Sequence, residues 1–245
     1  MTERSQRLAV LIDADNASAS IVDELFAEIA KLGVASVKRI YGDFSSPRLG
    51  GWNSKVLKHA IQQMQQPAFV TGKNASDIAL VIDAMDLLHS KRFDGFCLVS
   101  SDSDFTRLAS RIREEGVTVY GFGERKTPES FVAACDKFIY TEILRPPVKA
   151  SPRVRAAAKA PPPSRSAPVE MLRDAVEAKA DDSGWAHLGQ VGQVLLNRSP
   201  EFDPRNFGYK SMVAMFEGLP QFFDVRKQGS PGGSQTVYVL SKPSA

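Results

Sequence analysis

Acidic and amide side chains recur at three places in the first 105 residues of this 245-residue chain, each beside a run that predicts a strand or opens a helix. They are Asp13, Asp15 and Asn16 in IDADN, Asp77 in GKNASD, and Asp102 and Asp104 in LVSSDSDF. Several carboxylates at one site repel one another, and a shared cation is the simplest way to remove that repulsion. Oxygen ligands without His or Cys favour Mg²⁺ or Mn²⁺ over zinc.

A hard divalent cation held in this way makes a nucleophile from water and neutralises charge that grows on phosphate. The acids therefore predict the hydrolysis of a phosphodiester or a phosphomonoester. Removing one carboxylate, as in Asp13→Asn or Asp102→Asn, is expected to abolish hydrolysis and to raise the melting temperature in EDTA. Taken singly, Asp15, Asp77 and Asp104 also fit ordinary helix N-caps or first-turn acids.

Basic and aromatic residues near these acids are candidate contacts to a nucleic-acid backbone and its bases. They are Arg48, Trp52, Lys55, Lys58 and Lys73. Lysine and arginine can follow the phosphates while an aromatic ring stacks on a base. A solvated helix face for Lys55 and Lys58, and a packing role for Trp52, are the alternatives.

The elements that must position the acids are predicted from the period of the apolar residues. Strands are expected at residues 7–13, 37–41, 68–71, 95–100 and 117–122, and helices at 16–32, 54–64, 76–89, 103–115 and 128–135. In the helix at 76–89, Ile78 and Ile82 are expected to face inward. This alternation predicts an α/β fold with a doubly wound, mostly parallel sheet. Ligands of such sheets bind beyond the carboxyl ends of the strands, where the strand order reverses. If strands 7–13 and 95–100 are neighbours, acids from all three places meet there.

The three motifs, in this order, make residues 6–143 resemble the NYN domain, a branch of the PIN-like nucleases. The resemblance implies a metal-dependent ribonuclease on a compact PIN-like sheet, with endonucleolytic cleavage as the expected mode. It implies a catalytic, metal-binding centre made of Asp13, Asp77, Asp102 and Asp104, with Asn16 orienting a ligand or water. Asp15 is expected to contribute from outside this centre. Asp83 lies about 240° round the helix from Asp77, so a structural role is expected for it.

The basic excess of the chain, a net charge of +3, is confined to one segment. Residues 1–144 carry 17 Lys and Arg against 19 Asp and Glu, and residues 169–245 carry eight against nine. Residues 145–168 carry six basic residues, no acid and seven of the 15 prolines. This Pro/Ala/Arg-rich composition predicts an extended, mobile linker over 145–167. It is either a soluble spacer or a cationic tether for a polyanion.

The last part of the chain predicts a small winged-helix (α+β) domain. Helices are expected around residues 169–176, 188–195 and 209–216, followed by a hairpin of 222–227 and 235–240. With FDPRNFGYKSM and GLPQFFDV in place, residues 168–242 resemble the LOTUS (OST-HTH) domain. That family binds RNA and, in some members, protein partners, and it occurs attached to NYN domains. The candidate RNA contacts are Arg205, Lys210, Arg226 and Lys227.

These observations predict three regions: an NYN domain at 1–144, the linker at 145–167 and a LOTUS domain at 168–245. The leading interpretation is an RNA-cleaving, Mg²⁺- or Mn²⁺-dependent nuclease with a tethered RNA-binding module. A haloacid-dehalogenase-type phosphatase would use Asp13 and Asp15 as its nucleophile pair, but it expects Thr or Val where this chain has Ala17. A non-catalytic RNA-binding adaptor with the same acids is the third interpretation. No P-loop or complete GxGxxG motif is present.

The compartment is expected to be the cytoplasm. The charged start MTERSQR leads straight into a strand and does not resemble a secretory signal, and no run is long enough to predict a membrane helix. Two distant cysteines, Cys97 and Cys135, lack metal-type spacing and indicate buried thiols in a reducing environment.

Overall fold

The computed structural model describes residues 5–66, 75–144, 167–229 and 235–243. The chain divides into two compact units, Met1–Pro147 and Val148–Ala245, and each is described by itself. The predicted linker at 145–167 lies almost wholly outside the described residues. None of the helices in the described ranges is long and apolar enough to cross a membrane.

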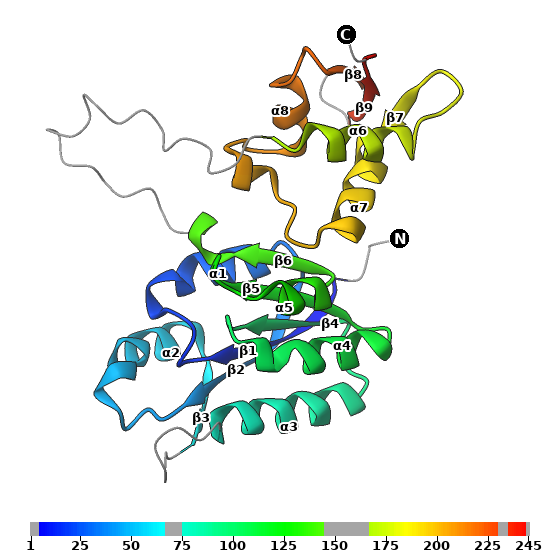
Figure 1. Cartoon of the computed structure of the whole chain (residues 1–245). Coiled ribbons are helices and arrows are strands. Elements are labelled where there is room, and N and C mark those ends of the chain that lie inside the picture. The colour runs from blue at the N-terminus through cyan, green and yellow to red at the C-terminus, as the bar shows by residue number, and fades with distance from the viewer. Residues whose placement is uncertain (1–4, 67–74, 145–166, 230–234, 244–245) are drawn as a thin grey trace, which may run out of the picture. The chain divides into compact units, whose positions relative to one another are not determined.

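A six-stranded parallel sheet forms the centre of the first unit (Figure 1). Its strands are β1 (Arg7–Asp13), β2 (Val34–Gly42), β3 (Gln62–Gln65), β4 (Gly95–Val99), β5 (Thr118–Gly123) and β6 (Lys137–Tyr140). The order across the sheet is β3-β2-β1-β4-β5-β6. Each step away from β1 follows the chain, so the strand order reverses between β1 and β4. The predicted doubly wound α/β fold is confirmed.

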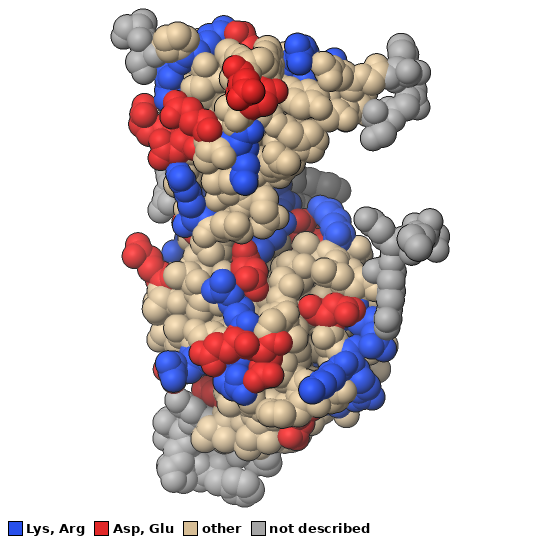
Figure 2. Space-filling view, turned by 90° about the vertical axis from the view of Figure 1, so that its right-hand side faces the viewer, with Lys and Arg blue, Asp and Glu red and all other residues tan. Residues whose placement is uncertain are grey.

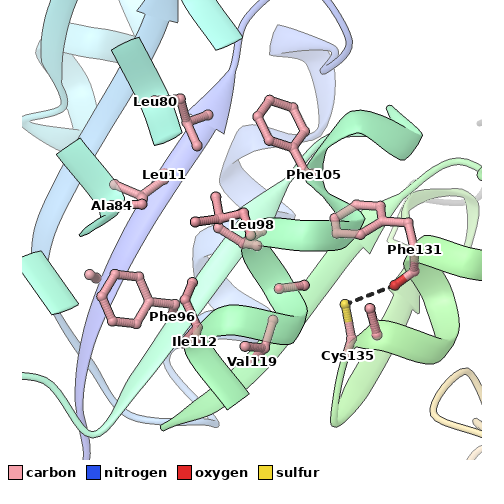
Figure 3. Close-up of a cluster of buried hydrophobic side chains, with 14 of the residues drawn as sticks. Leu11, Leu80, Ala84, Phe96, Leu98, Phe105, Ile112, Val119, Phe131 and Cys135 are labelled. Atoms are coloured by element: carbon pink, nitrogen blue, oxygen red, sulfur yellow. Dashed lines mark hydrogen bonds between the residues drawn. The ribbon is translucent and has the colours of Figure 1, made fainter. Parts of the chain in front are cut away.

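Helices cover both faces of this sheet. The α-helices among the described residues of this unit are α1 (Val22–Ile29), α2 (Asn53–His59), α3 (Ala75–His89), α4 (Thr106–Glu114) and α5 (Glu129–Ala134). Helices α3, α4 and α5 pack with Ala9 and Leu11 of β1 in one core, part of which is drawn in Figure 3. Helix α1 and the 3₁₀ turn before α2 pack with Leu8, Val10 and Ile12 on the opposite face. Strand β1 is apolar from Leu8 to Ile12 because successive side chains enter different cores.

The region after α2 differs from the prediction of a helix over 54–64. Ala60 adopts a left-handed conformation, with φ 50° and ψ 52°, and ends α2 at His59. A left-handed residue cannot continue a right-handed helix, so the chain leaves extended and forms the edge strand β3. The strand predicted at 68–71 lies outside the described residues.

Two further features of the first unit escaped the sequence prediction. Ile78 and Ile82 are 60% and 58% exposed, because α3 presents Leu80, Ala84 and Leu87 to the sheet instead. An apolar run on nearly every side of a helix leaves its buried face ambiguous. Strand β6 was not predicted, since four residues after a short helix give too little periodicity.

The second unit consists of short helices on one face of a three-stranded antiparallel sheet. Its elements are α6 (Val169–Glu177), β7 (Trp185–His187), α7 (Leu188–Arg198), α8 (Met212–Glu217), β8 (Phe223–Gln228) and β9 (Thr236–Ser241). The sheet order is β7-β9-β8, and Leu172, Val191, Phe216 and Val239 lie in the core. The predicted helices and hairpin are present. Strand β7, which was not predicted, adds the third strand.

Candidate functional site

The carboxyl ends of β1 and β4 lie side by side in the first unit. The two strands pair in parallel with Ile12 opposite Val99, so Asp13 and Ser100 emerge next to each other. Strands β2 and β3 continue the sheet on one side of this point, and β5 and β6 continue it on the other. The expectation that these strands are neighbours is confirmed, and the acids that follow them lie at the topological switch point.

Asp13 is buried, with 1% of its surface exposed, and both of its carboxylate oxygens accept hydrogen bonds. Oδ1 accepts from the backbone N–H groups of Asp15 at 3.0 Å and Asn16 at 3.3 Å. Oδ2 accepts from Ser100 Oγ at 2.7 Å and Asn16 Nδ2 at 2.8 Å. Burial raises the pKa of Asp13, and these hydrogen bonds oppose that rise. Asp13 therefore fixes the loop after β1 as well as supplying a carboxylate.

Ser100 connects the two strand ends and was missed as a site residue. Its hydroxyl donates to Asp13 and accepts the backbone N–H of Asp102 at 3.1 Å. Asp102 in turn caps the 3₁₀ turn Ser103–Phe105 by accepting the N–H of Asp104 at 2.9 Å. The position of Ser100 in the sequence gave no indication that its hydroxyl contacts Asp13, which lies 87 residues away.

Asp77 lies in the first turn of α3, near enough to the other acids to interact with them electrostatically. Its pKa is raised from 3.8 to about 6, first by burial and then by repulsion from Asp13, Asp102, Asp104 and Asp15. The structure thus brings all five predicted acids within electrostatic reach of one another. Helix capping explains each acid singly, but it does not explain why a half-buried carboxylate is placed among four others.

Asn16, Asp15 and Asp104 form the exposed rim of this cluster. Among the described residues, no three His, Cys, Asp or Glu side chains already form a set that could hold a metal ion. The donor set still fits a hard divalent cation, because it offers only carboxylate and amide oxygens. The repulsion that raises the pKa of Asp77 would also be relieved by positive charge at this place.

The basic candidates of the first unit fall into different environments. Lys55, Lys58 and His59 of α2 surround the single carboxylate of Asp23, at 2.8, 2.9 and 2.6 Å. Arg48 is exposed, and Lys73 lies outside the described residues. In the face shown in Figure 2, Lys and Arg are interspersed with Asp and Glu rather than gathered in one patch.

The aromatic candidate Trp52 does not offer its ring to a base. It is only 2% exposed and packs in the core against the α1 side of the sheet. The packing alternative therefore replaces the predicted stacking role, because a base can stack only on an accessible ring face.

Asp83 has the structural position that was expected. Its carboxylate accepts hydrogen bonds from the Tyr41 hydroxyl and the Arg39 guanidinium, both on β2. Burial and the neighbouring Asp83 raise the pKa of Tyr41. This contact ties α3, and with it Asp77, to the sheet.

Some of the basic residues of the second unit that were predicted to contact RNA form ion pairs within the protein. Arg205 forms hydrogen bonds and an ion pair, at 2.6 Å, with the buried carboxylate of Asp203. Lys227 pairs with Glu217 at 2.7 Å, and Lys210 is exposed. The remaining candidate, Arg226, lies on the outer face of the sheet with its guanidinium 4.7 Å from the ring of Trp185. The contacts of Arg205 with Asp203 therefore indicate a structural role for this arginine, which was predicted to contact RNA.

Comparison with protein families gives two matches that follow one another along the chain. The model of the NYN domain matches residues 7–144, and the model of the OST-HTH/LOTUS domain matches residues 162–235. The first match covers more than half of the chain and includes every acid of the site. NYN is a PIN-like nuclease domain and the LOTUS domain binds RNA, as the sequence predicted. No curated protein matches the sequence.

Two solved structures are similar to parts of the chain. A protein of unknown function from Vibrio parahaemolyticus is 18% identical, with 56% of this chain and 94% of that chain covered and a TM-score of 0.49. An uncharacterized protein from Nitrosomonas europaea is 29% identical, with 41% of this chain and 95% of that chain covered and a TM-score of 0.32. The assignment of the chain rests on the family matches and not on these similarities.

Proposed function

Because this chain belongs to the NYN domain family and carries an OST-HTH/LOTUS domain after it, we propose that it is a divalent-metal-dependent ribonuclease. RNA is held in part by the second unit and cut at the acidic site of the first. The observation that carries the proposal is the meeting of Asp13, Asp77, Asp102, Asp104 and Asp15 at the β1/β4 switch point.

Asp13, Asp77, Asp102 and Asp104 would hold Mg²⁺ or Mn²⁺ in this proposal, with Asp15 outside them. When bound, such a cation lowers the pKa of a water molecule and neutralises charge on the phosphate. Asn16 donates from its Nδ2 to Asp13 Oδ2, and its exposed position allows it to contact a water molecule or the RNA. Ser100 links Asp13 to the loop that carries Asp102 through its two hydrogen bonds.

The family match supports the nuclease over the phosphatase alternative. A haloacid-dehalogenase-type phosphatase also expects Thr or Val at the position of Ala17. The burial of Asp13 does not separate the two, because attack on phosphorus and coordination of a cation each need a free oxygen lone pair, and both oxygens of Asp13 accept two hydrogen bonds. A cation bound by Asp13 would displace one of these donors.

The test is incubation of the full chain with labelled single-stranded and structured RNA in Mg²⁺, Mn²⁺ or EDTA. Cleavage with either metal and none in EDTA is expected, and the product lengths show whether the cut is endonucleolytic. Asp77→Asn should slow cleavage by about 100-fold or more, since the loss of a group that only supports a metal ligand already costs about 10- to 100-fold. The matched control is Asp86→Asn, the same change at an exposed position of α3.

Two outcomes would contradict the nuclease. RNA bound by the wild-type chain but never cut would favour the non-catalytic adaptor. Hydrolysis of p-nitrophenyl phosphate through a phosphoenzyme would favour the phosphatase. Equal cleavage by the Asp77→Asn and Asp86→Asn proteins would overturn the assignment of the site.

A further inference from the structure

The outer face of the sheet in the second unit carries aromatic and basic side chains. Ala186, Phe223 and Val239 of this sheet are buried in the core beneath it. Side chains alternate between the faces of a strand, so their neighbours along the strands point the opposite way. The outward positions include Trp185 and His187 on β7, Tyr238 on β9 and Arg226 on β8. Tyr238 lies directly opposite both Arg226 and His187 in the strand register.

The guanidinium of Arg226 reaches across the central strand β9 and lies over two aromatic rings. Its central carbon is 4.7 Å from the centre of the Trp185 ring and 5.9 Å from that of Tyr238. The ring of His187 meets Tyr238 edge-on at 5.7 Å. Trp185, Arg226, Tyr238 and His187 together are called the outer platform below. Its members come from all three strands, so the fold assembles it.

The backbone that carries Trp185 is held by a turn. Asp181 Oδ1 accepts the N–H groups of Ser183 at 2.9 Å and Trp185 at 3.1 Å. The N–H of Asp181 donates to the carbonyl oxygen of Trp185 at 2.9 Å. These bonds fix the start of β7 before any partner arrives, which reduces the ordering cost of binding at the ring.

Arg226 keeps its hydrogen-bonding capacity available. Within the ranges that the structure describes, its side chain forms no hydrogen bond and no ion pair, in contrast to those of Arg205 and Lys227. Hydrogen bonds from Ser183 lower the pKa of Asp181, and Arg226 contributes electrostatically to this, but the Asp181 carboxylate forms its hydrogen bonds within its own turn, to the N–H groups of Ser183 and Trp185. A guanidinium that lies over aromatic rings can still present its other face and its N–H donors outward.

Resting on the proposed action on RNA, we propose that the outer platform is the surface on which this unit stacks the bases of single-stranded RNA. An unpaired base stacks on the guanidinium plane of Arg226, and the N–H groups at its edge contact the neighbouring phosphate. Stacking on aromatic and arginine planes is how proteins hold unstacked bases, whereas the bases of a duplex are already stacked on each other. Strong electrostatic attraction is not required, which suits a region with eight basic residues against nine acids.

The experiment measures the affinity of the full chain for a short, labelled, unstructured RNA in EDTA by fluorescence anisotropy. Trp185→Ala and Arg226→Ala should each weaken binding by about 5- to 100-fold, the range that loss of one stacking contact produces. Arg226→Lys keeps the charge but loses the plane, so it should weaken binding nearly as much with the same salt dependence. Trp185→Phe keeps a ring and should retain most of the affinity. A duplex of the same length should bind more weakly to the wild type.

The matched control is Arg198→Ala, which removes one positive charge from α7 of the same unit, where Arg198 pairs with Asp174 at 3.2 Å. Its affinity should stay near that of the wild type. Melting curves of every variant show whether the unit is folded. If Trp185→Ala unfolds the unit, the single variants Trp185→Phe and Arg226→Lys still test the proposal.

Two results would overturn the proposal. Unchanged RNA affinity in both alanine variants would leave the outer platform to a protein partner instead. Equal losses in Arg198→Ala and Arg226→Ala, with Arg226→Lys like the wild type, would show that charge alone matters. Incubation of the wild type with the same RNA and Mn²⁺ tests the nuclease separately. Cleavage there with unchanged platform variants refutes only the platform, and binding without cleavage refutes only the nuclease.

Discussion

At the scale of single residues, Asp77 is the carboxylate that most clearly opposes folding in the absence of a cation. Its pKa is raised to about 6 in the folded unit from an ordinary 3.8, so the folded protein binds this proton more tightly than the unfolded chain does. The stabilising contribution is complete below the unfolded pKa and is lost as the pH rises through the folded value. Ionised Asp77 therefore destabilises the unit near neutral pH.

We expect Asp77→Asn to melt at a higher temperature than the wild type in EDTA at about pH 7.5, and the difference to shrink toward about pH 4.5. Mg²⁺ or Mn²⁺ should raise the melting temperature of the wild type more than that of the variant, because the cation neutralises the same repulsion. Differential scanning calorimetry at the two pH values measures both effects. A variant less stable than the wild type at neutral pH would show that Asp77 has a structural role.

The sequence predicted the members of the acidic site but treated them as equivalent. Asp13→Asn was expected to relieve repulsion, yet Asp13 accepts four hydrogen bonds inside the protein. In Asp13→Asn the new amide NH₂ group would face hydrogen-bond donors. We therefore expect Asp77→Asn, and not Asp13→Asn, to raise the melting temperature. Spacing shows which acids follow strands, whereas the donors around each acid depend on contacts between residues as distant as Asp13 and Ser100.

At the scale of elements, the orientation of α3 decides where Asp77 lies. Asp83, 16% exposed at its side chain, joins α3 to Arg39 and Tyr41 of β2. We expect Asp83→Ala to lower the free energy of unfolding by about 2 kcal/mol, the range for hydrogen bonds to a charged group. Cleavage should also weaken, since the helix start that carries Asp77 loses an anchor. Urea unfolding followed by circular dichroism measures the first effect.

The control for that change is Asp86→Ala, at an exposed position on the same helix, which should stay within about 0.5 kcal/mol of the wild type. If the two variants unfold at the same urea concentration, the contact to β2 does not stabilise the unit. Asp83 could be excluded from the site by its angle around the helix, but its partners could not be predicted. They lie 42 and 44 residues away in the sequence.

Strand and helix prediction succeeded where apolar residues run uninterrupted and failed where the backbone changes direction. Strand β1 and the order of the α/β units followed from buried runs such as Leu8–Ile12. The end of α2 depends on the left-handed Ala60, a conformation that nothing in an alanine signals. The short strands β6 and β7 exist because neighbouring strands supply their hydrogen bonds, which is information from the tertiary fold.

At the scale of the whole molecule, positive charge is separated along the chain from the acids of the proposed site. Residues 1–144 carry more acids than bases, while residues 145–168 carry six bases and no acid. We expect that changing these six Lys and Arg to Gln weakens RNA binding by the full chain. The plot of log affinity against log salt should become less steep by up to about 4, because each phosphate contact on a single strand contributes about 0.7.

A variant in which the four arginines of this segment become lysines keeps the charge and should retain the salt dependence. Anisotropy titrations at several salt concentrations distinguish the two proteins. Identical slopes for the wild type and the glutamine variant would show that the segment is a spacer. If the segment does raise the local concentration of RNA, the cleavage rate at low RNA should fall in parallel with the affinity.

The two cysteines give the molecule a property that concerns neither RNA nor metal. Cys97 is fully buried in β4, and Cys135, at the end of α5, donates to the carbonyl oxygen of Phe131 (Figure 3). Burial raises the pKa of both thiols, that of Cys135 to about 12, so neither is a reactive thiolate in the native protein. Both belong to the first unit, and the second has no cysteine. The rate at which a small reagent alkylates these thiols therefore measures the opening of the first unit alone. Unfolding of the second unit does not change this rate.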